Sequence, residues 1–150
     1  MHACACVQPM SRQDALAVVR TMNGESATLA FKALSDRTRL RMVRLLASND
    51  AEMCVCEFVD VLQERQYNVS RQLKALASAG LVRGEKDGRW TYFRLLAGED
   101  AAVASLCRLV AELPAEGEFR DDQRRFKKRI KLRSEGRCRV GIQSPSLRST

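Results

Sequence analysis

The sequence predicts a mainly α-helical protein with one β-hairpin. Residues 54–62 and 66–79 form two amphipathic helical segments separated by a short polar break, which is the outline of a helix-turn-helix. Two strand-like segments follow, joined by Asp87-Gly88, a dipeptide typical of two-residue hairpin turns. A hairpin directly after a helix-turn-helix is a wing. We therefore expect a winged helix-turn-helix that forms a dimer and carries a basic C-terminal tail.

The basic side chains are concentrated near the C-terminus. The 150-residue chain has a formal net charge of +8. Residues 1–119 hold 15 Lys or Arg and 15 Asp or Glu, whereas residues 120–150 hold 11 basic and 3 acidic side chains. A basic tail on a neutral domain indicates a nucleic-acid partner or a solvated arm. We divide the chain into a flexible cysteine-containing arm (1–10), a winged helix-turn-helix domain (11–113) and a basic C-terminal tail (114–150), partly helical and then disordered.

The composition argues against several classes of protein. No run approaches the roughly 18 apolar residues that a membrane span needs, and the first residues lack the charged start and apolar middle of a secretory signal. We therefore expect a cytoplasmic protein with no membrane partner. In a reducing cytoplasm its six cysteines are ligands, reactive thiols or small core residues rather than disulfides. Their spacings do not form the paired C-x-x-C of a zinc ribbon.

Three helices are predicted before the helix-turn-helix. Ser11 to Asp14 has the spacing of a capping box, so a helix should begin there and run to about Met22. Asp36 is a good N-cap for the third helix, whose inward face is apolar. The second helix carries apolar residues at helical spacing, namely Ala27, Ala30, Phe31 and Leu34.

The first helix of the helix-turn-helix should begin near Cys54. On an ideal helix Cys54 and Cys56 diverge by about 200° and cannot bind one small ion. In a fraying first turn, whose backbone N–H groups have no helical partner, the two thiols can swing together. The helix N-terminus also lowers thiol pKa and so favours the thiolate that binds soft ions. We therefore predict a soft-ion site at Cys54 and Cys56; the alternative is that both are small buried core residues.

The second helix, residues 66–79, carries the predicted DNA-reading surface. Its core face holds Val69, Leu73 and Leu76, and Gly80 ends the helix. Asn, Gln and Arg side chains can contact base edges in the major groove, while Ser, Tyr and Lys more often contact phosphates. The predicted DNA-binding residues on its polar face are Gln66, Tyr67, Asn68, Ser70, Arg71 and Lys74.

The hairpin should pair residues 81–86 with residues 89–96, which places Lys86 and Arg89 beside its tip. There the two side chains can contact backbone phosphates or a minor groove, so they join the predicted DNA-binding residues. The aromatic residues of the hairpin have strand spacing. We interpret them as packing residues rather than as a stacking platform for single strands.

The last helix of the domain should cover residues 100–113 and present one apolar stripe. On a small domain such a stripe is a natural pairing surface, which predicts a homodimer. Cys107 lies beside the stripe and is interpreted as a core or dimer-interface thiol. A basic helix should follow and lie on the partner subunit, on DNA or in solvent; its narrow apolar stripe is Phe119, Phe126 and Ile130. The Ser- and Pro-rich end of the chain is expected to be disordered.

Four segments together resemble the ArsR/SmtB family of metalloregulators. The likeness covers roughly residues 25–113, and the C-V-C placement is similar to that of the arsenic-responsive repressors. The segments occur in the family's order: FKALSDRTRLRMVRLL (31–46), CVCEFVDVL (54–62), VSRQLKALASAGLV (69–82) and GRWTYFRL (88–95). The resemblance implies a homodimeric repressor, not an enzyme, that binds an inverted repeat in double-stranded operator DNA. It implies release from DNA when arsenite or antimonite binds cysteine, with no zinc or organic cofactor.

The chain departs from the best-known arsenic-type pattern, in which a third cysteine lies three residues after the second. Val59 stands at that position here. Trivalent arsenic prefers three thiolates, and we choose Cys138 as the third because some arsenic-type relatives end in a similar Gly-Arg-Cys segment. Cys4, Cys6 and Cys107 stay open as alternatives. The family's other common site uses histidines on the last helix; residues 100–113 hold none, so a zinc sensor of that kind is not expected.

Other functions stay open at this point. A redox-sensing repressor would form a disulfide between Cys54 or Cys56 and a distant cysteine. A repressor for cadmium or lead would use the same thiols, and methylated arsenicals would need only two of them. A small thiol reductase would need an activating base or a C-x-x-C, but the one histidine is His2.

Overall fold

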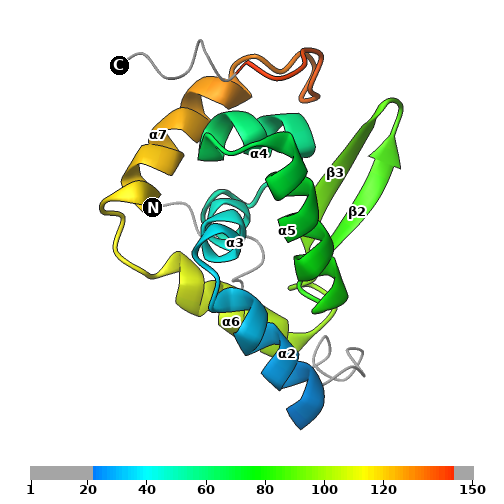
Figure 1. Cartoon of the computed structure of the whole chain (residues 1–150), viewed down its shortest axis with the longest axis vertical. Coiled ribbons are helices and arrows are strands. Elements are labelled where there is room, and N and C mark those ends of the chain that lie inside the picture. Colours follow the sequence, from blue (N-terminus) through cyan, green and yellow to red (C-terminus); the bar gives the residue numbers. More distant parts are fainter. Residues whose placement is uncertain (1–21, 144–150) are drawn as a thin grey trace.

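The computed structural model describes residues 22–143. The arm predicted for residues 1–10, the helix predicted from Ser11 and the Ser- and Pro-rich end lie outside these residues. The helices are α2 (Gly24–Leu34), α3 (Arg37–Asn49), α4 (Val55–Leu62), α5 (Gln66–Ser78), α6 (Ala101–Ala111) and α7 (Glu118–Ile130). The strands are β1 (Met53–Cys54), β2 (Val82–Asp87) and β3 (Trp90–Leu95). The predicted winged helix-turn-helix is confirmed (Figure 1).

Side-chain caps fix where several helices begin. The Asp36 carboxylate accepts a hydrogen bond from the Arg39 backbone N–H at 3.0 Å, which confirms the N-cap predicted for α3. The Asp100 carboxylate accepts from the Ala102 N–H at 2.8 Å and begins α6 in the same way. These bonds satisfy N–H groups that the first turn of a helix leaves without a partner.

The two helices of the helix-turn-helix share one core. α4 ends at Gln63, whose φ of 56° is left-handed, and α5 begins three residues later. Phe58 and Val61 of α4 and Val69 of α5 are each 0% exposed. This packing fixes which face of α5 is left for solvent and for a partner.

The wing contains a third strand that the sequence did not predict. β2 and β3 pair antiparallel, and Gly88 takes a left-handed φ of 63° in the turn between them. β1 adds to the other edge of β3, with Met53 opposite Phe93 and Cys54 opposite Tyr92. The sheet order is therefore β1-β3-β2, and the wing is joined directly to the start of α4.

The basic helix α7 packs against the domain. It lies against α4 and α3, on the opposite side of the molecule from α5 and the wing (Figure 1). Phe126 is 8% exposed and belongs to the main core, with Ile130 packed against it. The core thus continues past residue 113, where the sequence analysis divided domain from tail. Residues 131–143, called the C-terminal segment below, then cross the face of α4 (Figure 1).

None of the helices in the described part of the chain combines the length and apolar character needed to span a membrane.

Candidate functional site

Two thiols that are neighbours in the sequence lie together with a third that is more than 80 residues away. Cys54, Cys56 and Cys138, called the thiol cluster below, pack with Tyr92 in a cluster separate from the main core. Their exposed fractions are 1%, 9% and 0%. The Sγ atoms of Cys54 and Cys138 and one carboxylate oxygen of Glu57 all lie within 4.8 Å of one another. This spacing would let one ion contact donors from the start of α4 and from the C-terminal segment.

The cysteines proposed as alternatives are placed differently. Cys107 of α6 is 0% exposed and lies in the main core, which fits the core role that the sequence analysis gave it. Cys4 and Cys6 lie outside the described residues. Among the four cysteines that the structure describes, Cys138 is therefore the one that joins Cys54 and Cys56.

The end of β1 explains how Cys54 and Cys56 can share a site. Cys54 has the extended conformation of an N-cap (φ −87°, ψ 167°), whereas Cys56 lies in the first turn of α4. The divergence of about 200° expected on an ideal helix does not apply, because Cys54 is outside the helix. The Cys54 backbone N–H donates to Glu57 Oε2 at 3.0 Å, which fixes this start of α4 without fraying.

One buried ion pair and one partly buried pair hold the C-terminal end of α7 and the segment after it on α4. Arg129 Nε lies 2.6 Å from Asp60 Oδ2, and both side chains are at most 1% exposed. Arg133 Nε lies 2.6 Å from Glu57 Oε1, and its Nη2 lies 2.8 Å from Oε2. Removing one member of such a pair would leave an uncompensated charge in the interior, at a cost of about 3–5 kcal/mol. Arg129 Nη2 also donates to Cys138 Sγ at 3.4 Å, so the pair positions the third thiol.

The charge state of the thiols follows from burial. Burial raises the pKa of the Cys54 thiol well above its ordinary value, and the Glu57 carboxylate raises it further. Burial also raises the pKa of Cys56, with Cys138 adding to the shift and Arg129 opposing it. The expectation that the helix N-terminus lowers thiol pKa is wrong here, because removal from water is the larger effect. Without an ion, Cys54 and Cys56 therefore carry protons.

The C-terminal segment also contacts the wing. The Cys138 backbone N–H donates to the Tyr92 hydroxyl at 2.8 Å. The Arg137 guanidinium lies 4.6 Å from the centre of the Tyr92 ring, and it pairs with Glu52 and, at 3.1 Å, with Asp87 near the wing tip. A cavity of about 380 Å³ between the wing and the C-terminal segment is lined by Cys138, Tyr92 and Arg137, among others. Because Cys138 lines this cavity, the cavity lies directly beside the thiol cluster.

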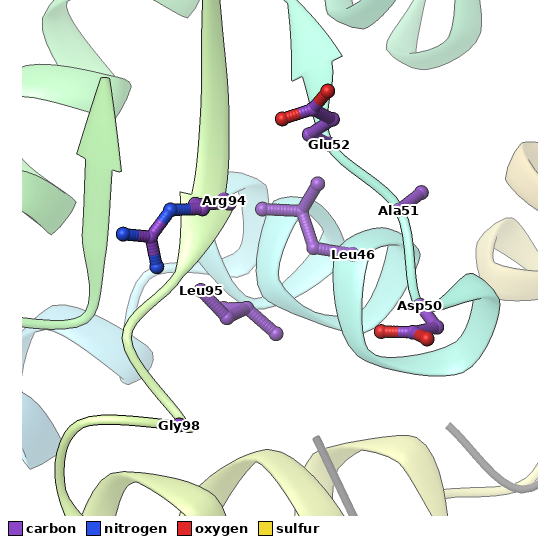
Figure 2. A pocket seen from close by; sticks show the side chains of 7 residues that line it. All are labelled: Leu46, Asp50, Ala51, Glu52, Arg94, Leu95 and Gly98. Atoms are coloured by element: carbon purple, nitrogen blue, oxygen red, sulfur yellow. The ribbon is translucent and has the colours of Figure 1, made fainter. Parts of the chain in front are cut away.

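The larger cavity shown in Figure 2 holds no thiol. It has a volume of about 400 Å³ and is lined by Leu46, Asp50, Ala51, Glu52, Arg94, Leu95 and Gly98. Figure 2 shows Asp50, Ala51 and Glu52 on the connection from α3 to β1. This hollow is adjacent to β1 but offers no soft ligand.

All but one of the predicted DNA-binding side chains are exposed. Gln66, Tyr67, Ser70, Arg71 and Lys74 of α5 are exposed, and so are Lys86 and Arg89 at the wing. Among the large apolar side chains that the structure describes, Tyr67 is the most open, at 77% exposed. Asn68 is half-buried: its Nδ2 donates to Glu64 Oε2 at 3.1 Å, and its Oδ1 accepts from Gln72 at 3.3 Å. Arg39 of α3 in turn donates to Gln72 Oε1 at 2.6 Å, which ties α5 to α3.

Sequence reasoning missed Glu57, Asp60, Tyr92, Arg129 and Arg133. Arg129 lies in the last turn of α7, and Arg133 follows the helix. No local pattern around either arginine indicates that it pairs with a carboxylate on α4. Only the folded chain brings these partners, 69 and 76 residues apart, into contact.

The chain is similar to known regulators over its central part. Residues 36–83 match the family model described as "Bacterial regulatory protein, arsR family". Over 89 residues the chain is 39% identical to an uncharacterised helix-turn-helix transcriptional regulator of Methanocaldococcus jannaschii, a match covering 59% of this chain and 96% of that relative.

Relatives with a stated role in metal resistance match over shorter stretches. The arsenic resistance transcriptional regulator ArsR1 of Pseudomonas putida is 42% identical over 67 residues, which is 45% of this chain and 52% of the relative. The cadmium resistance regulatory protein CadC of Listeria innocua is 36% identical over 63 residues, which is 42% of this chain and 52% of the relative. The match thus spans about half the length of these two relatives.

Solved structures with this fold include regulators. Reduced HlyU from Vibrio cholerae superposes with a TM-score of 0.54 at 26% identity, covering 63% of this chain and 94% of that one. A homodimeric winged helix-turn-helix DNA-binding domain from Mycobacterium bovis, described as a possible ArsR-family transcriptional regulator, gives a TM-score of 0.50 at 26% identity. That match covers 73% of this chain and 95% of the other.

Proposed function

The chain belongs to the ArsR/SmtB family of winged helix-turn-helix transcriptional regulators, and from that premise we propose that it is an arsenic- or antimony-responsive repressor. It binds operator DNA in the cytoplasm as a homodimer and leaves the DNA when arsenite or antimonite binds Cys54, Cys56 and Cys138. The gathering of these three thiols in one buried cluster is the observation that carries the proposal. A trivalent ion is satisfied by three sulfurs, and the described residues supply that number at this cluster.

The contacts of the thiol cluster explain how an ion could alter DNA binding. Cys54 belongs to the same sheet as the wing, and Cys138 is hydrogen-bonded to Tyr92 of β3. Drawing the three sulfurs onto one ion therefore displaces both the start of α4 and the wing strand. The ion shifts DNA occupancy only by the difference in its affinity for the two states, on a usual scale of about 1–3 kcal/mol.

DNA is read by α5 with help from the wing. We propose that the two α5 helices of a dimer enter successive major grooves of an inverted repeat, about one helical turn apart. Lys86 and Arg89 add phosphate contacts, which make the affinity depend strongly on salt. The exposed face of α5 and the wing tip described above support this arrangement.

The dimer surface is proposed to include α2 and α6. These helices carry three large apolar side chains that a single chain leaves in solvent. Leu29 is 50% exposed, Phe31 is 59% exposed and Leu109 is 58% exposed. Covering them in a second copy would remove apolar area from water, which is the usual driving force for association.

The proposal is tested by fluorescence anisotropy of a labelled operator with the fully reduced protein. Arsenite should release the wild-type protein, while Cys54→Ser/Cys56→Ser should stay bound. Cys107→Ser is the matched control, because that thiol lies in the main core away from the cluster and its loss should leave the response intact. A wild-type protein that binds the operator and ignores arsenite would sink the sensor assignment.

A sensor for a divalent soft ion is the second candidate. One oxygen of Glu57 joins the sulfurs of Cys54 and Cys138 within 4.8 Å, and such mixed sulfur and oxygen sets bind divalent ions. Cadmium and lead are therefore run beside arsenite in the same assay. Peroxide forms a further arm; release by peroxide alone would identify a redox sensor instead.

A further inference from the structure

We propose that the ion pair between Arg133 and Glu57 sets the ion selectivity of the thiol cluster. Arg133 keeps the Glu57 carboxylate off the ion, and this favours a trivalent ion held by three sulfurs over a divalent ion held by two sulfurs and an oxygen. The inference rests on the proposed function, because it takes the thiol cluster to be the ion site.

The Glu57 carboxylate lies within reach of an ion in the thiol cluster, but its oxygens already accept hydrogen bonds. A Glu57 oxygen lies within 4.8 Å of the Sγ atoms of both Cys54 and Cys138. Arg133 binds the two oxygens at 2.6 and 2.8 Å, and the Cys54 backbone N–H donates to Oε2 at 3.0 Å. Glu57 is 1% exposed, so solvent offers little compensation when one of these bonds is broken. An ion that recruits Glu57 must therefore approach the positive charge of Arg133 and compete with three N–H donors for the lone pairs of the carboxylate.

Charge balance gives the same direction. The pairs Arg129–Asp60 and Arg133–Glu57 each sum to zero. Three thiolates with a trivalent ion also sum to zero, and the complex adds no net charge to the interior. Three thiolates with a divalent ion leave one negative charge, which is costly where no thiol is more than 9% exposed.

A divalent ion avoids that charge by using only two thiolates, and it then lacks a third strong ligand. Among the described residues, Glu57 is the one carboxylate that lies within 4.8 Å of the Sγ atoms of both Cys54 and Cys138. Its availability therefore decides how well cadmium competes with arsenite. Arg133 controls that availability from the C-terminal segment, outside the set of ligands.

Arg133→Gln and Arg133→Lys test this with the full-length reduced protein. Gln removes the positive charge and releases both oxygens, whereas Lys keeps the charge but cannot hold two oxygens at once. Binding is measured by equilibrium dialysis against arsenite and against cadmium, with elemental analysis of both compartments. We expect the affinity for cadmium relative to arsenite to rise about 10- to 100-fold in Arg133→Gln, the scale on which outer partners of ligands act. Arg133→Lys should show a smaller rise.

Two further proteins separate selectivity from a merely loosened C-terminal segment. Arg137→Gln is the matched control: this arginine also holds that segment, through Glu52 and Asp87, but forms no ion pair with Glu57. The affinity of Arg137→Gln for cadmium relative to arsenite should equal that of the wild type. The double variant Arg133→Gln/Glu57→Gln keeps the loosened segment but lacks the carboxylate, and it should return to the wild-type ratio.

Each outcome is decisive. An equal change for both ions in Arg133→Gln, or a shift that persists in the double variant, would overturn the selectivity role while leaving the arsenic sensor in place. Should Arg133→Gln not fold, the Arg133→Lys and double variants carry the same comparison. A wild-type protein that binds neither ion would overturn the proposed function together with this inference.

Discussion

Cys54 and Tyr92 face each other in the pairing of β1 with β3, so the first thiol of the cluster and the wing belong to one sheet. Tyr92 also accepts the backbone N–H of Cys138 at 2.8 Å. A single wing residue is thus bonded or paired to both ends of the thiol cluster. The site proposed for the ion and the element proposed to contact DNA are therefore neighbours. Their coupling does not require a long series of intervening residues.

Replacing Cys138 should separate arsenite from its methylated forms. In Cys138→Ser we expect the affinity for arsenite to fall by at least about tenfold, because losing a ligand should cost no less than losing an outer partner. A methylated trivalent arsenical has two open positions, which Cys54 and Cys56 still fill, so its affinity should change little. Operator-release titrations with the two compounds check this, and an equal loss for both would contradict the three-sulfur assignment.

The pH dependence should differ between arsenite and cadmium. Because burial raises the pKa of Cys54 and Cys56, these thiols are protonated through the neutral range and must lose their protons on binding. Arsenite arrives as a neutral trihydroxide whose hydroxyls take up those protons and leave as water, so its affinity should stay flat from pH 6 to 8. Cadmium releases the protons to solvent, so its affinity should rise about 100-fold per pH unit for two thiols. Dialysis across this range measures both slopes.

Tyr92→Phe should cost stability and weaken the coupling between ion and DNA. The substitution leaves the buried Cys138 N–H without its acceptor, a loss of about 1–3 kcal/mol in the free energy of unfolding. Urea denaturation measures this. Tyr67→Phe, at a side chain that is 77% exposed, should leave stability unchanged. If arsenite lowers the operator affinity of Tyr92→Phe as much as that of the wild type, the ion acts without the wing.

Arg89→Ala should weaken DNA binding without altering sequence preference. A lost phosphate contact reduces affinity for specific and non-specific DNA alike and lowers the slope of log affinity against log salt by about 1. Lys127→Ala is the control, since this exposed lysine lies on α7, across the molecule from the wing (Figure 1). An equal effect of Lys127→Ala would mean that the basic face of α7 also contacts DNA.

The elements with local signals could be predicted from sequence. Asp36 predicts the start of α3 because its side chain can cap the helix, and Asp87-Gly88 predicts the hairpin because this dipeptide favours the turn conformation. Each of these patterns acts within a few residues, so the local sequence is enough to determine the secondary structure there. β1 has only two residues, too few for a periodic pattern, and it forms because β3 offers an open edge.

The rest of the site depends on contacts between distant parts of the chain. Cys138 was chosen through a family resemblance, whereas its burial depends on Arg129 and Arg133 meeting carboxylates of α4. A run of charged residues normally indicates a solvated face, and nothing within α7 marks Arg129 as buried. The direction of the Cys54 pKa shift was missed for the same reason, because burial is a property of the whole fold.

Among the proposed ligands, Cys138 lies farthest along the chain from the proposed DNA-contacting side chains. The proposed DNA-contacting side chains all fall between residues 66 and 89, while the proposed third sulfur lies in the C-terminal segment, beyond the stretch that matches the family model. A variant changed only in residues 131–143 should therefore keep its proposed operator-reading side chains while its response to the proposed inducer changes. This segment is the place to begin when a biosensor is engineered from this chain.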